Sequence, residues 1–253
     1  MNKKRILILG GTGEARELAH AAHERMGAIA TIITSLAGRT TEAAEGLIDL
    51  PGEVPTGGFG GSDGMVRFIR DERIAAVVDA THPFAAQISK NAKAACDATQ
   101  TPRLHLIRPE WTPPEGARIE KVASIEAAAR LAGKNATRCF LTIGSQGCEA
   151  FADLAHVFFL VRTIEGTSPP FKNAKAITQR PPFTVESERA LMTKHQIDLL
   201  VTKESGGRAT EAKIKAAAEM GIPIVMIERP APMQGDRADT IKDALKWMLE
   251  RVR

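Results

Sequence analysis

Ile6-Leu7-Ile8-Leu9-Gly10-Gly11-Thr12-Gly13-Glu14 is the stretch that decides the fold of this 253-residue chain. Its four apolar residues form a short continuous run, which is typical of a strand buried on both faces of a parallel sheet. Beyond the glycines, apolar residues recur at helical spacing from Glu14 to Met26. Glycines let the backbone approach a phosphate closely, and a helix N-terminus offers it unpaired N–H groups. The stretch therefore predicts a strand, a phosphate-binding turn and a helix.

The glycine turn departs from the dinucleotide fingerprint G-x-G-x-x-G, because Arg16 stands where the third glycine belongs. A tight strand-to-helix turn without a ligand is the alternative interpretation, but the position directly after the first strand favours phosphate binding. NAD-binding units usually place Asp or Glu after the second strand, where this chain has Ser35 and Arg39. These donors favour a 2′-phosphate, so we expect NADP(H). A solvated loop arginine is the alternative for Arg39.

Strand and helix patterns alternate along the whole chain. Strands are expected at 6–9, 28–34, 75–80, 104–107, 139–143, 157–162, 198–202 and 223–227, and helices at 14–26, 65–73, 85–98, 125–132, 185–195, 210–220 and 239–252. A weaker apolar segment lies at 47–50, and residues 108–118, with three prolines, indicate a linker. We therefore expect an α/β protein of two Rossmann-like, doubly wound domains with mainly parallel sheets, residues 1–110 and 111–253. The last helix is left to either domain, and ligands are expected in the inter-domain cleft, beyond the carboxyl ends of the strands.

Asp79-Ala80-Thr81-His82-Pro83-Phe84-Ala85 follows a buried strand at its carboxyl end. Helix capping would explain Thr81 as the N-cap and Pro83 as an early helical residue. It does not explain His82. A histidine at this place can donate to a ligand or supply a proton near neutral pH.

The second half repeats this arrangement in two loops that follow strands. Thr142 and Gly144 end one strand, and Lys203-Glu204-Ser205-Gly206-Gly207 ends another. Lys203, Ser205 and the N–H groups of Gly206 and Gly207 predict a site for carboxylate or phosphate. The alternative is a helix-capping loop with Thr210 and Lys213 at the surface. Arg162, at the end of an apolar strand, is a further cation that could face the cleft.

Composition excludes several classes of protein. The net charge of +4 favours anionic partners, but the basic residues are scattered and aromatic residues make up only 4% of the chain, so we expect no nucleic-acid partner. The absence of Tyr removes the Tyr-x-x-x-Lys acid of short-chain dehydrogenases. Three widely spaced cysteines indicate reduced thiols, and no metal-ligand motif is present. No apolar run could cross a bilayer or serve as a signal peptide, so we expect a soluble cytoplasmic protein with no membrane contact.

Several of these segments occur together, in order, in one family. Residues 8–12, the Gly-Gly-Phe-Gly-Gly loop at 57–61, the segments 79–85 and 201–207, Gly221-Ile222-Pro223 and 227–230 give a chain that resembles the precorrin-6A reductases of cobalamin biosynthesis. The resemblance implies NADPH-dependent reduction of a double bond in the precorrin-6A macrocycle, giving precorrin-6B. It also implies a polycarboxylate tetrapyrrole as substrate and neighbouring pathway enzymes as further candidate partners. The loop at 57–61 is more similar to the cobalt-late branch, whereas Gly13 departs from the Thr or small residue of many members.

The resemblance also implies roles for the candidate residues. Gly11, Thr12, Gly13 and Glu14 would hold the cofactor phosphates, Ser35 and Arg39 the 2′-phosphate, and Thr81, His82 and Phe84 would border the nicotinamide and macrocycle. Lys203, Ser205, Gly206 and Gly207, with Thr142, Gly144 and Arg162, would hold substrate carboxylates. His82 and bulk water are the two candidates for the catalytic proton donor.

Three alternatives remain at this stage. A non-catalytic NADP(H) sensor would use the glycine turn and Arg39, but it leaves the 203–207 loop without a role. A methyltransferase is disfavoured because the second strand lacks a terminal acid for the ribose hydroxyls. A cobalt-precorrin-6A reductase would act on the same macrocycle with the metal already inserted.

Overall fold

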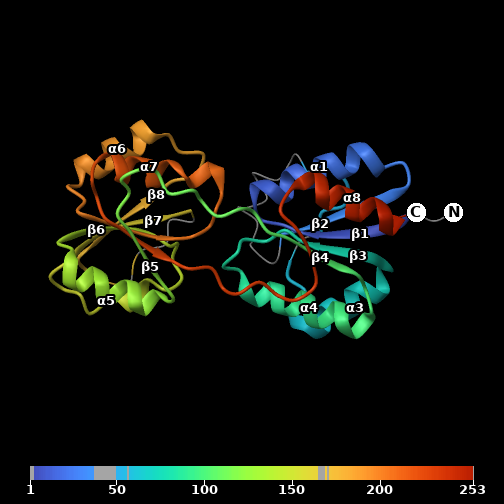
Figure 1. Cartoon of the computed structure of the whole chain (residues 1–253). Helices are drawn as coiled ribbons and strands as arrows, with labels where there is room; N and C mark the ends of the chain where they lie inside the picture. The colour runs from blue at the N-terminus through green and yellow to red at the C-terminus, as the bar shows by residue number, and fades with distance from the viewer. Residues whose placement is uncertain (1–2, 37–49, 56, 165–168, 170, 253) are drawn as a thin grey trace. The chain divides into compact units, whose positions relative to one another are not determined.

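The computed structural model describes residues 3–36, 50–55, 57–164, 169 and 171–252. The chain divides into two compact units (Figure 1). Residues up to Pro109 and from Pro230 onward form the first unit, and Glu110–Arg229 form the second. Among the described residues, no helix is long and apolar enough to cross a membrane.

The first unit is a five-stranded parallel sheet with helices on both faces. Its strands, in the order β11-β4-β3-β1-β2, are β11 (Asp236–Ala238), β4 (Arg103–Leu106), β3 (Ile74–Asp79), β1 (Lys4–Leu9) and β2 (Ala30–Ser35). Helices α1 (Gly13–Met26) and α8 (Ile241–Val252) cover one face of the sheet, and α3 (Gly61–Asp71) and α4 (Ala86–Thr99) cover the other (Figure 1).

The second unit is a six-stranded parallel sheet built in the same way. Its strands, in the order β5-β10-β9-β6-β7-β8, are β5 (Ile119–Val122), β10 (Ile224–Ile227), β9 (Leu199–Lys203), β6 (Arg138–Thr142), β7 (Phe158–Thr163) and β8 (Ala174–Thr178). Helices α6 (Val185–Lys194) and α7 (Ala212–Glu219) cover one face, and α5 (Ile125–Asn135) lies on the other (Figure 1). Short 3-10 helices span Cys148–Phe151 and Arg208–Thr210.

The continuous apolar run in β1 has the two-sided burial that its sequence predicts. Ile6 and Ile8 pack in the core beneath α1 and α8, whereas Leu7 and Leu9 pack in the core beneath α3 and α4. All four side chains are fully buried. The expected α/β fold with two parallel, helix-covered sheets is confirmed.

The last segment of the chain packs on the first unit. The boundary expected at residue 110 grouped 230–253 with the second domain and left the final helix open. In the structure β11 pairs with β4, and Trp247 donates from Nε1 to Asp236 Oδ2 over 2.6 Å. Met248 on α8 shares a core with Ile6 and Ile8. Apolar burial against the first sheet therefore decides where this segment lies.

Met248→Ala should destabilise the first unit and leave the second unchanged. Met248 is fully buried, and truncating such a side chain costs about 2–5 kcal/mol. Urea unfolding measures the loss, and amide hydrogen exchange assigns it: β1 and β3 should lose protection while β6 and β9 keep theirs. Lys246→Ala, at an exposed position on the same helix, should stay within about 0.5 kcal/mol of the unmodified protein. Equal loss of protection in β6 and β9 would contradict the assignment of α8.

Candidate functional site

The glycine turn is attached to the ends of the two strands that flank β1. Gly10 N donates to Ser35 O at the end of β2 over 2.7 Å. The hydroxyl of Thr12, the N-cap of α1, accepts from Ala15 N at 3.1 Å and donates to Ala80 O after β3 at 2.8 Å. These bonds fix the turn at the carboxyl edge of the first sheet.

The backbone of this turn leaves several N–H groups unpaired in the described part of the chain. Within the described residues, the N–H groups of Gly11, Thr12 and Gly13 have no hydrogen-bond acceptor. Gly11 has a φ of +103°, a conformation that favours glycine and turns its N–H out of any regular ladder. A Cβ at Gly13 would meet nothing within 4 Å, so the Thr or small residue of the resembling family would fit there. Unpaired N–H groups at a helix N-terminus are the usual backbone site for phosphate or carboxylate.

Glu14 lies in the first turn of α1, and its side chain already has an ion-pair partner. Its carboxylate lies 3.5 Å from the guanidinium of Arg108. If Glu14 helps to hold a phosphate, it would therefore do so through its backbone N–H. Arg39, the other charged residue predicted for this ligand, lies outside the described residues.

The segment after β3 is organised by Asp79. The Thr81 hydroxyl donates to Asp79 Oδ1 over 2.7 Å, and Thr81 N donates to the same oxygen over 3.2 Å. Helix α4 begins only at Ala86, after an N-cap at Ala85 with no side-chain hydrogen bond. The interpretation of Thr81 as a helix N-cap is therefore wrong. Thr81 instead shapes the loop that carries His82.

His82 is half-buried and held by its own loop. Its Nδ1 accepts from Phe84 N at 3.2 Å, and its carbonyl accepts from Ala85 N at 2.7 Å. The His82 and Phe84 rings are tilted against each other with centroids 5.9 Å apart. Because Nδ1 accepts a hydrogen bond, the ring proton of the neutral imidazole is on Nε2. The local structure therefore keeps Nε2 as the nitrogen that can donate.

Asp79 also has a buried polar neighbour on the adjacent strand, His105, which no sequence motif indicated. Asp79 is fully buried and its Oδ2 has no hydrogen-bond partner, and the same is true of the buried Nδ1 of His105. The two residues are register partners on β3 and β4. Burial lowers the pKa of His105, and the charge of Asp79 opposes that shift. His105 gave no signal in the sequence, because it occurs within an ordinary strand.

In the second unit, the ends of β6 and β9 bring the predicted loops together. Lys203 donates from Nζ to Ile143 O over 2.7 Å, and the Thr142 hydroxyl donates to Val201 O over 3.2 Å. Gly144 has a φ of +80° in the loop after β6. The neighbouring strand ends thus place Thr142, Gly144 and Lys203 at one edge of the sheet.

The loop after β9 is buried, and hydrogen bonds from neighbouring residues hold it. Ser205 is buried, and Gly206 has a φ of +67°. The Gly207 carbonyl accepts from Trp111 Nε1 at 3.1 Å and from Thr210 N at 3.2 Å. The backbone of this loop is therefore held in place at the carboxyl edge of the second sheet.

Arg162 and Lys213 differ from what their sequence positions suggest. Arg162 is buried and forms a two-pronged ion pair with Glu188 on α6, with N–O distances of 2.7 and 3.1 Å. Its charge is compensated inside the protein. Lys213 has only 5% of its surface exposed, so the interpretation that put it at the surface is wrong.

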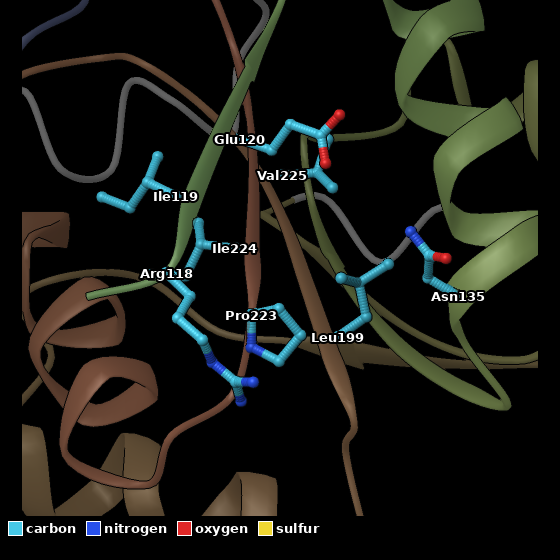
Figure 2. Close-up of a pocket in the computed structure, with 8 residues that line it drawn as sticks. All are labelled: Arg118, Ile119, Glu120, Asn135, Leu199, Pro223, Ile224 and Val225. Atoms are coloured by element: carbon cyan, nitrogen blue, oxygen red, sulfur yellow. The ribbon is translucent and has the colours of Figure 1, made fainter. Parts of the chain in front are cut away.

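A separate pocket opens at the opposite edge of the second sheet. It has a volume of about 400 Å³, and Figure 2 shows the eight residues that line it: Arg118, Ile119, Glu120, Asn135, Leu199, Pro223, Ile224 and Val225. Leu199 and Ile224 begin β9 and β10, whereas the loops described above follow the ends of the strands. None of the residues predicted for cofactor or substrate lines this pocket.

Two parallel, helix-covered sheets, each with glycine-containing loops at its carboxyl edge, define a Rossmann-like α/β protein. Among the described residues no cluster of His, Cys, Asp or Glu could hold a metal ion. The chain belongs to the precorrin-6x reductase CbiJ/CobK family, whose sequence model matches residues 5–249.

Full-length relatives agree with this assignment. The chain is 46% identical over 249 residues to the precorrin-6A reductase of Rhodococcus erythropolis, covering 96% of this chain and 97% of the relative. It is 29% identical over 261 residues to the cobalt-precorrin-6A reductase of Priestia megaterium, covering 98% and 99%. The solved structure of CobK precorrin-6A reductase superposes with a TM-score of 0.89 at 34% identity, covering 98% and 97%.

Thr12→Val should loosen the glycine turn. The substitution removes the cap on Ala15 and leaves Ala80 O without its donor, at a combined cost of roughly 1–3 kcal/mol. Thr12→Ser keeps both bonds and should unfold close to the unmodified protein in urea. If the two variants lost the same stability, the hydroxyl would not be the link between α1 and β3.

Proposed function

We propose that this chain uses NADPH to reduce one double bond of precorrin-6A, giving precorrin-6B in cobalamin biosynthesis. The observation that carries the proposal is the glycine turn with its unpaired N–H groups, in a chain similar over nearly its full length to precorrin-6A reductases. The cytoplasm is the proposed compartment, because the three cysteines are buried free thiols.

The first unit fits a nicotinamide dinucleotide. The N–H groups of Gly11, Thr12 and Gly13 would hold the pyrophosphate, together with the backbone of Glu14. No acid ends β2, so Ser35 and the proposed partner Arg39 suit a 2′-phosphate better than a ribose hydroxyl. When bound, NADPH supplies the hydride.

Thr81, His82 and Phe84 would border the nicotinamide and the reacting edge of the macrocycle. The bond from Phe84 N to His82 Nδ1 leaves the Nε2–H to donate a hydrogen bond to a ligand. To give a proton to the product, the ring would first take one up from solvent at Nδ1 and release that bond. Asp79 keeps this loop in shape through its two bonds from Thr81. The protein's part in the chemistry is to orient two ligands and exclude water.

The second unit would hold the substrate carboxylates. Ser205, the N–H groups of Gly206 and Gly207, and Lys203 supply the donors, with Thr142 and Gly144 beside them. Arg162 would contribute through its electrostatic field and its packing and not by direct hydrogen bonds to the substrate, because both of its terminal nitrogens bind Glu188. Metal-free precorrin-6A is favoured over the cobalt form, because relatives named for the former reach 46% identity and those named for the latter 30%.

The direct test is stoichiometric oxidation of NADPH when purified protein meets precorrin-6A, with precorrin-6B as product. Cobalt-precorrin-6A, assayed in parallel, should turn over more slowly. Binding of NADPH without turnover of either macrocycle would instead favour a nucleotide sensor. Binding of S-adenosylmethionine but not NADPH would favour a methyltransferase.

Arg39→Gln should weaken NADP⁺ binding about tenfold or more and leave NAD⁺ binding little changed, because a charge-assisted hydrogen bond to the 2′-phosphate would be lost. Isothermal titration with both nucleotides measures this. Arg25→Gln, at an exposed position in the last turn of α1, is the matched control and should bind both as the unmodified protein does. Equal weakening of NADP⁺ and NAD⁺ by Arg39→Gln would contradict 2′-phosphate recognition.

A further inference from the structure

Lys213 is a buried lysine with no role in the proposed reaction. It lies in the first turn of α7 with 5% of its surface exposed, and its Nζ is 5.2 Å from the centroid of the Trp111 ring. Among the described residues, no carboxylate forms an ion pair with it. Burial, together with the charge of Arg162, lowers the pKa of Lys213 to about 7, and Glu188 opposes this shift. A buried ammonium group without a counter-ion is costly, so this amine needs an explanation.

The neighbouring acid is not available to Lys213. Both oxygens of Glu188 accept from Arg162, at 2.7 and 3.1 Å. The same guanidinium lies over the rings of Phe183 and Phe140, 4.0 and 4.8 Å from their centroids. The Arg162–Glu188 pair is thus neutral as a unit and enclosed by apolar surface. Protonating Lys213 would give the cluster one surplus positive charge.

The other charged side chains around Lys213 do not supply the missing negative charge. At the start of α7, the N-cap residue Glu211 pairs with Lys215 at 3.4 Å. On α6, Arg189 pairs with Glu219 at the far end of α7. In the 3-10 helix that precedes α7, Arg208 is exposed and cationic. Within the described part of the chain, Glu188 is thus the only carboxylate whose charge acts on the Lys213 amine, and it is already paired with Arg162.

Trp111 connects this amine to the loop proposed to bind substrate. The indole N–H donates to Gly207 O over 3.1 Å, and Nζ of Lys213 lies over the face of the same ring. Helix α7 follows β9 and that loop, so its first turn lies at the carboxyl edge of the sheet. Trp111 thus contacts both the Lys213 amine and the Gly207 carbonyl of that loop.

We propose that Lys213 binds one carboxylate of the substrate beside Trp111 and the Gly206–Gly207 loop, and that its amine takes up a proton from solvent as the carboxylate arrives. An approaching carboxylate supplies the opposite charge that the cluster lacks, so it stabilises the ammonium form. The proton moves to Nζ and no covalent bond changes. This inference rests on the proposed function, because it takes the carboxylate from the acidic macrocycle.

The test is calorimetric binding of precorrin-6A to the complete protein at pH 8, in two buffers that differ in ionisation enthalpy. With a pKa of about 7 the free amine is mostly neutral at that pH, so binding should take up close to one proton. Lys213→Met keeps a side chain of similar length and removes the amine. It should abolish the proton uptake and weaken the binding of precorrin-6A about tenfold or more. Lys215→Met, half-exposed on the same helix, should match the unmodified protein. NADP⁺ binding should be the same in all three.

A pH series shows whether Lys213→Met folds and whether the amine is buried in solution. The pKa of Lys213 in the folded protein lies below its ordinary value of 10.5, so the unfolded chain binds the extra proton between about pH 7 and 10.5. Stability should therefore rise with pH across that window in the unmodified protein. Lys213→Met should be folded and lack this rise, whereas Lys215→Met should keep it.

Two results would overturn the inference, and they are distinguishable from failure of the proposed function. Tight binding of precorrin-6A with no proton uptake by the unmodified protein would remove the role of Lys213 and leave the reductase assignment intact. Unchanged affinity and uptake in Lys213→Met would do the same. Failure of the unmodified protein to bind precorrin-6A at all would instead contradict the proposed function itself.

Discussion

Every strand pair among the described residues is parallel, and the positions of both candidate ligand sites follow from this constraint. A parallel connection must cross a face of the sheet, so the loops that follow the strands gather at one edge. In the first unit that edge carries the glycine turn, the end of β2 and the loop of His82. In the second it carries Gly144 and the 203–207 loop.

At both edges, polar side chains form hydrogen bonds with the protein's own backbone. Thr12 binds Ala15 N and Ala80 O, and Lys203 binds Ile143 O. These bonds hold the loops in place, and among the described residues they leave the N–H groups of Gly11, Thr12 and Gly13 without an acceptor. A site of this kind is preorganised, because its donors need no rearrangement when an anion arrives.

Local sequence predicted the features that depend on local structure. Ile6–Leu9 had to be a two-sided strand, and the helices that follow were visible from their apolar spacing. The short strands β5, β8 and β11 were missed, because their residues are largely exposed and lack a strand pattern. Contacts distant in sequence were also not predictable: Glu188 neutralises Arg162 from 26 residues away, and Asp79 meets His105 only through strand pairing. Lys213 follows a polar loop, and its burial involves tertiary contacts such as the one with Trp111.

We propose that the first unit holds the nucleotide at the glycine turn and the second holds the acidic macrocycle. Backbone amide NMR during titration with NADP⁺ tests this division. Large shifts are expected at Gly11, Thr12 and Gly13, with Ser205, Gly206 and Gly207 unmoved until precorrin-6A is added. Shifts at the 205–207 amides with NADP⁺ alone, and none at the glycine turn, would contradict it.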